Sequence, residues 1–371
     1  MSTLTIKKNP SLNDFFAAAE YAYRETPQFV SILNTDIKRL LDKKNPLFAK
    51  HGSGDYYVAY RSGQPVGRIV AHIHQESNRK FNTDTGYFGY FDCINDLEVA
   101  SQLLQKAEAQ HKQSGMRKIS GNFNLTAMQQ IGVVTDQFQN DPYTDQVYSP
   151  DYLPTLLERN GYQKEFPMRT FEIDLTQTKP EDLKSAKTES IFNNPDYSFE
   201  KVIRKNFSTS LESVREVLND GFQNNPMFVP LTSEEFLYQA KDMMWILDPE
   251  ISALLTYNKR AVGTIVCIPD LNQFFRATRS KLSWRTPLAF INHKLTRDRA
   301  VIIFYSVAQE FHGRGINSAM LFKVISALKA RGYQKLGITW ISEQNQASLR
   351  QVEKMGAKTL HKLHLFSKDL V

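Results

Sequence analysis

The sequence repeats one order of elements in its two halves, and this internal repeat is the feature that most restricts how the chain can fold. Residues 56–70 read as a β-hairpin, because β-branched and aromatic residues flank a short polar turn. Residues 253–266 repeat that pattern, and Gly67 matches Gly263. In each half the hairpin is followed by helix, strand, helix and strand. This order predicts a duplicated α/β domain.

Two further pairs of glycines, Gly115 with Gly332 and Gly161 with Gly356, follow the same order. The number of residues between the two members of a pair increases from the first pair to the second and decreases again in the third. The increase predicts an insertion within about residues 270–299 of the second half. The decrease predicts another insertion within about residues 122–150 of the first half. Gly115 and Gly332 each lie where a helix is expected to end before a strand.

A polar stretch separates the two copies. Residues 176–190 contain few large apolar side chains, as is typical of a linker with a short helix beginning at Pro180. We therefore expect an α/β protein in which mixed central sheets are flanked by helices. The expected boundaries are a first domain over residues 1–176, a linker over 177–198 and a second domain over 199–371.

Composition excludes several classes of protein. A hydrophobic share of 41% excludes global disorder. The densest apolar run, residues 261–268, is far shorter than the roughly 20 residues that cross a bilayer as a helix. The N-terminus does not read as a secretory signal, and Cys93 and Cys267 form no metal-ligand pair. We expect a cytoplasmic protein without a membrane span or a metal. The net charge of +7 is spread along the chain and does not by itself select a partner.

The second half contains a glycine loop between a strand and a helix. Residues 301–308 read as a strand buried on both faces, and a helix begins at Ile316. Gly313 and Gly315 lie between them and allow successive backbone N–H groups to point at one anion. The helix N-terminus adds further N–H donors and a positive dipole. The pattern predicts a phosphate site, although a glycine pair also occurs in ordinary strand-to-helix turns.

The order of motifs after this loop resembles the GNAT superfamily of N-acetyltransferases. The matching parts are residues 307–316 with the helix behind them, the strand at 337–341 and the block at 345–357. The whole chain resembles a bacterial group of tandem-GNAT proteins whose substrates are poorly known. The resemblance implies two tandem acyl-CoA N-acyltransferase folds, each with a mixed central sheet.

The resemblance also implies a cofactor and a reaction. Acetyl-CoA or another acyl-CoA would be the co-substrate, and its acyl group would pass directly to an amine of a small molecule or peptide. In the family the glycine loop binds the diphosphate, and the pantetheine arm lies where the strand before it splays from the next strand. Carried over to this sequence, the cofactor-binding residues are Val307, Ala308, Phe311, His312, Gly313, Arg314, Gly315, Ile316 and Asn345.

The catalytic groups are less well marked. The tyrosine that commonly acts as the general acid in the family falls at Val352. Either another residue protonates the leaving thiolate or the thiolate leaves unassisted, and we expect positioning to dominate. The candidates are Tyr305, His361 and His364 as proton donors and Glu343 as the base. Each of these residues could equally be an ordinary surface or core residue without a catalytic role.

The first half lacks the glycine pair at the equivalent place. Its helix over residues 97–114 begins among Asp92, Asp96 and Glu98, whose carboxylates satisfy the helix dipole and would repel a diphosphate. We expect this half not to bind CoA in the usual way, and to support the fold or shape the acceptor pocket.

Two other function classes and one further segment remain open at this stage. The chain could be a non-catalytic acyl-CoA-binding or regulatory protein, or an aminoacyl transferase that uses charged tRNA, although the intact glycine loop argues for CoA and against nucleic acid. The basic and aromatic residues 271–284 could contact RNA or a membrane surface. A packing helix with buried Phe274, Phe275 and Leu282 fits this segment better.

Overall fold

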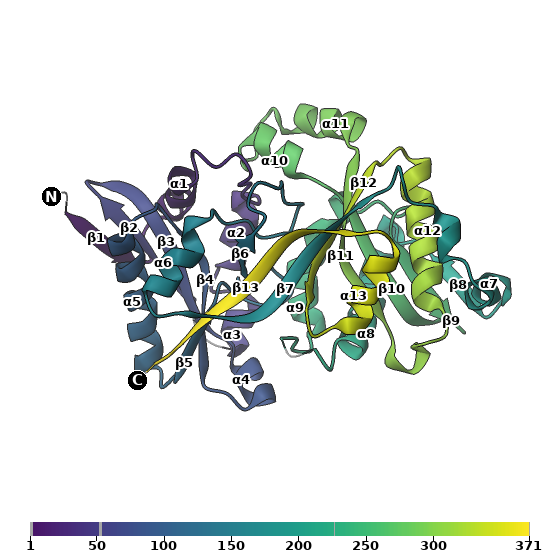
Figure 1. Ribbon diagram of the computed structural model, residues 1–371, viewed down its shortest axis with the longest axis horizontal. Helices are drawn as coiled ribbons and strands as arrows, with labels where there is room; N and C mark the ends of the chain where they lie inside the picture. Colours follow the sequence, from purple (N-terminus) through teal and green to yellow (C-terminus); the bar gives the residue numbers. More distant parts are fainter. Residues whose placement is uncertain (1–2, 52–53, 226, 371) are drawn as a thin grey trace.

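One long mixed sheet runs through the molecule, with helices on both faces (Figure 1). The computed structural model describes residues 3–51, 54–225 and 227–370. The strand order is β1-β2-β3-β4-β5-β13-β7-β12-β11-β10-β9-β8, and β6 pairs with β13 off this path. The strands are β1 (Leu4–Lys8), β2 (Gly54–Arg61), β3 (Gln64–Ile73), β4 (Thr85–Cys93), β5 (Lys118–Gly121), β6 (Val133–Asp136), β7 (Gln163–Asp174), β8 (Tyr197–Glu200), β9 (Ala253–Tyr257), β10 (Arg260–Pro269), β11 (Arg299–Val307), β12 (Lys335–Ser342) and β13 (Lys358–Asp369).

The helices pack their apolar faces against the sheet. In α12, for example, Met320, Leu321, Val324 and Leu328 are buried. The α-helices are α1 (Leu12–Ala22), α2 (Asn34–Leu40), α3 (Pro46–His51), α4 (Gln75–Phe81), α5 (Leu97–Gln113), α6 (Tyr152–Arg159), α7 (Ala186–Asn193), α8 (Phe207–Gly221), α9 (Ser233–Ala240), α10 (Asn272–Thr278), α11 (Thr286–Thr296), α12 (Ile316–Ala330) and α13 (Gln346–Lys354), and the short 3-10 helices are η1 (Pro180–Leu183), η2 (Arg204–Asn206), η3 (Lys241–Trp245) and η4 (Gln309–Phe311).

The two halves exchange their last strands at the centre of the sheet. β7 ends the first half but pairs with β12 of the second, and β13 ends the second half but pairs with β5 of the first. The two long strands also pair with each other, from Lys358 opposite Glu172 to Ser367 opposite Gln163. In Figure 1, β13 visibly crosses from the C-terminal half to the N-terminal half beside β7. Each half of the sheet is therefore completed by the other half of the chain.

Each half has an apolar core on both faces of its sheet. In the first half, α5 and α6 cover one face and α1, α2 and α3 the other. In the second half, α12 and α13 cover one face, while α8 and α9 cover the other. Among the described residues, no helix is long and apolar enough to cross a membrane.

The structure confirms the repeated elements that the sequence predicted. The two hairpins are β2–β3 and β9–β10, and the predicted long helices are α5 and α12. The expected insertion in the second half contains α10 and α11. Phe274 and Phe275 are buried as expected, but the expectation for Leu282 was wrong, since this side chain is 56% exposed. It lies between the two helices, where no element of the described chain covers it.

The strand exchange predicts that a change near the C-terminus weakens the N-terminal core. Phe366 on β13 is fully buried and packs in the cluster formed with α5 and α6. We expect Phe366→Ala to lower the free energy of unfolding by about 3–5 kcal/mol, the usual cost of removing a buried phenylalanine ring. Urea unfolding followed by tyrosine fluorescence measures it, and Lys362→Ala, an exposed change on the same strand, is the control. Equal urea midpoints of unfolding for the two variants would show that the exchanged strand β13 does not support the N-terminal core.

Candidate functional site

The site is built where β11 and β12 part. These parallel strands pair from Arg299–Lys335 only as far as Ile302–Ile338, although both continue beyond this point. On its other side β11 carries a β-bulge, because Val266 and Cys267 of β10 face Phe304 and Ile302 and leave Ile303 as the extra residue. A bulge increases local twist and bends the strand that carries it. The bulge thus turns the end of β11 away from β12.

The glycine loop lies at the end of β11. Gly313 and Gly315 have φ angles of 75° and 89°, a left-handed conformation that glycine adopts without strain. Gly315 is the N-cap of α12, so no side chain caps this helix. The N–H groups of its first turn have no partner within the helix, as at any helix start. Backbone donors of this kind, beside a positive helix dipole, bind phosphate groups.

Cationic side chains surround the loop. Nζ of Lys187, on α7, donates to the carbonyl oxygen of Gly313 at 2.8 Å. The guanidinium of Arg314 lies 4.6 Å from the ring centre of Phe311. Nε2 of His312 donates to the carbonyl oxygen of Val307 at 3.0 Å. The carboxylate of Glu310 is paired with the exposed Arg260, which offsets the charge that it brings to the loop.

Helix α8 fixes the loop against the strand. Oδ2 of Asp220 accepts a hydrogen bond from the backbone N–H of Gln309 at 2.6 Å. Gly221, at the end of α8, touches β11 closely, since a Cβ there would lie 1.9 Å from Oγ of Ser306. This close approach requires glycine and holds the end of β11 in one place.

Tyr305 is the candidate proton donor nearest to the point where the strands part. Its hydroxyl is buried without a hydrogen-bond partner, and its ring packs against the cluster under α12. Burial raises the pKa of this hydroxyl well above its usual value, so the group remains protonated at neutral pH. An unpartnered buried hydroxyl fits a site that gains its polar partner from a ligand.

The other three candidates lie in different surroundings. Glu343 follows β12 and forms an ion pair with Arg169 at 3.3 Å. His361 and His364 lie on β13, which is separated from β12 by β7. Nε2 of His361 donates to the carbonyl oxygen of Asn140 at 3.1 Å, and Nδ1 of His364 lies 2.8 Å from Oγ1 of Thr135. Burial lowers the pKa of both imidazoles. The structure therefore does not bring these side chains together with Tyr305.

The equivalent gap in the first half is filled by the chain itself. β4 and β5 also part after four residue pairs, at Phe88 and Gly121. There, Oδ1 of Asn124 accepts from the N–H of Tyr90 at 2.7 Å, and Oδ1 of Asn122 accepts from the N–H of Phe91 at 3.1 Å. The described part of the chain sends no comparable amide to β11 beyond its bulge.

The start of α5 also differs from that of α12, because an acidic side chain of the chain itself caps it. Oδ1 of Asp96 accepts hydrogen bonds from the N–H groups of Glu98 and Val99, at 2.9 and 3.2 Å. Arg61 forms ion pairs with both Asp96 and Glu98. The donors that an anion would use are therefore already satisfied.

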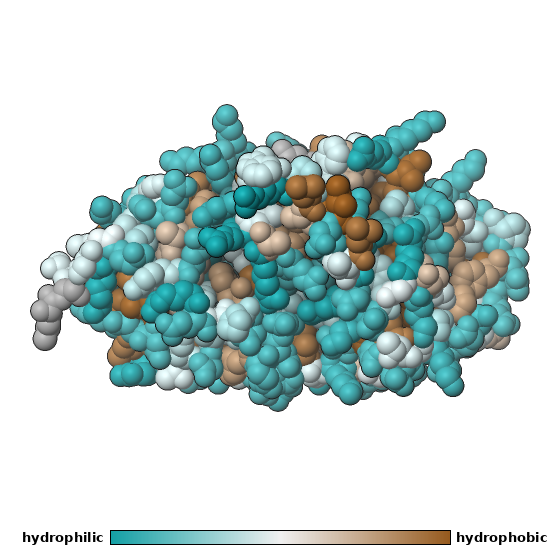
Figure 2. All heavy atoms as spheres, turned by 90° about the horizontal axis from the view of Figure 1, so that it is seen from above, coloured by the Kyte–Doolittle hydropathy of each residue, from teal (hydrophilic) through white to brown (hydrophobic). Residues whose placement is uncertain are grey.

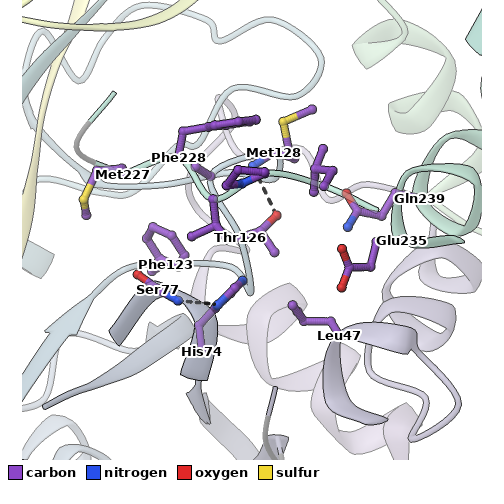
Figure 3. Close-up of a pocket in the computed structure, with 14 residues that line it drawn as sticks. Leu47, His74, Ser77, Phe123, Thr126, Met128, Met227, Phe228, Glu235 and Gln239 are labelled. Atoms are coloured by element: carbon purple, nitrogen blue, oxygen red, sulfur yellow. Dashed lines mark hydrogen bonds between the residues drawn. The ribbon is translucent and has the colours of Figure 1, made fainter. Parts of the chain in front are cut away.

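A pocket lies between the two halves and is lined by residues of both. It encloses about 460 Å3, including the part open to solvent, and Figure 3 shows His74 and Ser77 facing Glu235 and Gln239 across it. Nδ1 of His74 accepts from the N–H of Ser77 at 3.1 Å. Oε2 of Glu235 accepts from the N–H of Thr232 at 2.9 Å, which is half of a capping box at the start of α9. The sequence signals only a helix start here, because the pocket walls come from distant segments.

A second pocket is almost entirely apolar. It lies between α8 and the strands β9, β10 and β11, and it encloses about 450 Å3, including its open part. Phe304, the residue after the bulge, forms part of its wall. The pocket thus begins beside the point where β11 and β12 part. Its lining residues are Val202, Phe207, Leu211, Val214, Phe236, Met243, Leu247, Ser252, Ala253, Thr264, Ile265, Val266 and Phe304.

Comparison with known families agrees with this geometry. Residues 211–357, which include most of α8, the bulged strand, the glycine loop and α13, match the Acetyltransferase (GNAT) family. This segment of the second half therefore resembles a GNAT acetyltransferase domain. The match agrees with the acyltransferase that the glycine loop and its resemblance predicted.

Similar proteins span the whole chain. Protein YghO of Escherichia coli (strain K12) is 25% identical over 377 residues, which cover 98% of this chain and 94% of the relative. Bacterial ceramide synthase of Caulobacter vibrioides is 23% identical over 378 residues, covering 100% and 98%. A tandem GNAT protein from the clavulanic acid biosynthesis pathway superposes with a TM-score of 0.60 at 10% identity, covering 100% and 99% of the two chains. The predicted fold of two tandem GNAT domains is confirmed.

The unpartnered hydroxyl of Tyr305 leads to a stability prediction. We expect Tyr305→Phe to leave the free energy of unfolding unchanged or slightly higher, because it removes a buried polar group that has no hydrogen bond. Tyr143→Phe is the contrast, since its hydroxyl donates to Oε2 of Glu172 at 2.7 Å and its loss would cost about 1 kcal/mol or more. Urea unfolding of both variants measures the difference. A clear destabilisation by Tyr305→Phe would mean that the hydroxyl has a partner in solution.

Proposed function

We propose that the protein is an acyl-CoA-dependent N-acyltransferase that passes an acyl group directly from the thioester to an amine. The observation that carries the proposal is the combination of the uncapped N-terminus of α12, the positive-φ glycines before it, and the open gap beyond the bulge of β11. This combination offers donors for a diphosphate next to a space for an extended arm. The filled gap and the capped α5 of the first half support binding in the second half alone.

The residues present suit each part of acyl-CoA. The N–H groups of Gly313, Gly315 and Ile316 would bind the diphosphate, with Lys187 and Arg314 supplying charge. The adjoining strand end and Asn345 complete the site. Val307 and Ala308 would lie along the pantetheine arm, and Phe311 and His312 would shape the turn. Oδ1 of Asn345 caps α13 at the N–H of Ser348, so its Nδ2 is the group that could contact the arm.

The reaction requires little covalent chemistry from the protein. Acyl-CoA supplies a reactive thioester. The amine nitrogen forms a bond to its carbonyl carbon, the carbon–sulfur bond breaks to release CoA, and the proton that the amine loses passes to water. Backbone N–H groups of β11 beyond the bulge can donate to the carbonyl oxygen as negative charge develops on it. The protonated hydroxyl of Tyr305 can donate to the departing sulfur. The family's tyrosine position is occupied by the buried Val352.

A hydrocarbon substrate is favoured over a purely polar one. The apolar pocket begins at Phe304, beside the proposed position of the thioester. A relative of nearly equal length is named as a bacterial ceramide synthase, and a ceramide is the N-acyl derivative of a long-chain amine. We infer that the substrates include a long acyl chain, and that the acceptor is an amine of the sphingoid type. The first half, with its side of the pocket in Figure 3, would then shape the acceptor site.

The cofactor site can be tested with two matched glycine variants. Gly313 and Gly332 have φ angles of 75° and 79°, and an added Cβ would meet nothing within 4 Å at either position. We expect Gly313→Asp to weaken CoA binding at least about a hundredfold, which is about 2.7 kcal/mol, because the carboxylate repels the diphosphate. Gly332→Asp, at the other end of α12, carries similar backbone strain and should keep the affinity. Isothermal calorimetry with CoA on the full chain measures both, and equal affinities would place the cofactor elsewhere.

The proposed acyl-chain pocket can be tested by narrowing it. Val214 on α8 is buried and lines the apolar pocket. We expect Val214→Phe to lower kcat/KM for palmitoyl-CoA by about tenfold relative to acetyl-CoA, because the larger ring occupies space needed by the chain. The assay follows CoA release with dihydrosphingosine as the amine, and Val214→Ala is the matched control. Comparing two donors within one variant cancels any loss of folded protein. An unchanged ratio would remove this pocket as the chain site.

The same assay separates the other classes of function. A binding or regulatory protein would bind CoA without releasing it from the thioester. An aminoacyl transferase would require charged tRNA and would not use acyl-CoA. Release of CoA that depends on the amine, without RNA, supports the proposal.

A further inference from the structure

The segment containing α10 and α11 has an unusual charge pattern. Residues 271–297 include six basic side chains and no acidic one. The segment lies along the upper edge of the molecule in Figure 1, over the junction of the two halves. Its basic residues are Arg276, Arg279, Lys281, Arg285, Lys294 and Arg297.

The inner face of this segment is anchored firmly. Phe274 and Phe275 are buried and pack with Val30 and Leu33 from the N-terminal half. The backbone N–H of Asn34 donates to the carbonyl oxygen of Ser280 at 3.0 Å. α10 and α11 therefore form a fixed platform, and their outer face has a defined orientation.

The outer face carries a stripe of large apolar side chains. Trp284, Leu288, Ile291 and Leu295 are 78%, 65%, 55% and 81% exposed. Spacings of three and four residues place Leu288, Ile291 and Leu295 on one side of α11, and Trp284 lies in the turn just before this helix. Figure 2 looks down on this edge, where hydrophobic side chains gather among hydrophilic ones. Single exposed apolar residues are common on proteins, but a stripe along one helix indicates an interaction surface.

Basic side chains flank the stripe. The guanidinium of Arg285 lies 4.9 Å from the ring centre of Trp284, and Nζ of Lys294 lies 4.9 Å from that of Phe290. Tryptophan and aliphatic residues bordered by lysine and arginine are typical of helices that lie in the interface of a membrane. The stripe is mainly aliphatic, whereas RNA-binding surfaces stack bases on aromatic rings.

We propose that the outer face of α10–α11 docks on the surface of a membrane rich in anionic lipids. Arg276, Lys281 and Arg297 are paired with carboxylates of other segments, whereas Arg279, Arg285 and Lys294 form no ion pair with the described residues. The charge complementarity between these three side chains and anionic headgroups selects the occupant. The platform as a whole lies next to the apolar pocket, because Ile246 packs both against the buried inner cluster of α10–α11 and against the cluster that contains α8 and Phe304. The enzyme would thus approach its hydrocarbon substrate from the bilayer. Docking itself does not depend on the proposed reaction.

Vesicle flotation of the full chain tests docking without any assay of activity. We expect binding to phosphatidylcholine vesicles that contain phosphatidylglycerol, weaker binding to phosphatidylcholine alone, and release by salt as exposed charges are screened. The triple variant Leu288→Gln, Ile291→Gln, Leu295→Gln should lose at least about tenfold in partitioning, because it removes the side chains that enter the interface. These positions are exposed, so the fold should persist.

Two further variants sharpen the test. Leu237→Gln on α9, which is also an exposed apolar residue, should bind as the wild type does. Arg285→Glu with Lys294→Glu should lose the preference for anionic vesicles. The proposal is overturned if the wild-type chain does not float, if the triple variant floats equally well, or if the preference for anionic vesicles is absent. It is also overturned if the stripe instead supports a lipid-free dimer in sedimentation equilibrium, or binding of a single-stranded RNA, that the triple variant abolishes.

Discussion

The pairing of β7 with β13 at the centre of the sheet is the constraint on which the rest of the structure depends. Each strand comes from one half of the chain and completes the sheet of the other. β12, one wall of the proposed cofactor gap, is held by β7 from the first half. A half that lacks the glycine loop is therefore still needed to position the half that has it.

The two copies differ at the place where the second half has the proposed cofactor site. In each, a bulged strand parts from its parallel neighbour after four residue pairs. In the first half, the amides of Asn122 and Asn124 saturate the exposed strand edge, and Asp96 caps the following helix. In the second half, the helix starts at a glycine without a side-chain cap. Glycine in place of a capping side chain costs roughly a few tenths of a kcal/mol, and a bound anion can restore that stabilisation.

The apolar features of the second half form a connected set. The pocket under α8 reaches the bulge of β11, and Ile246 joins its surrounding cluster to the platform of α10 and α11. A hydrocarbon chain would gain free energy from burial in such surroundings, whereas a polar substrate would not. A site next to an interfacial surface also shortens the path that an insoluble amine would have to travel through water.

Local patterns in the sequence determined the elements and the glycine loop of this protein. Alternating and helical periodicity located the hairpins and α12, and Gly313 with Gly315 marked the loop, because these properties depend only on neighbouring residues. Tertiary structure alone decided the strand exchange. A strand's sequence specifies which face is buried, but β13 could have paired within its own half with the same pattern. The placement of His74 and Glu235 on the walls of one pocket, and the exposure of Leu282, also depend on tertiary structure, since both are set by which distant segments pack together.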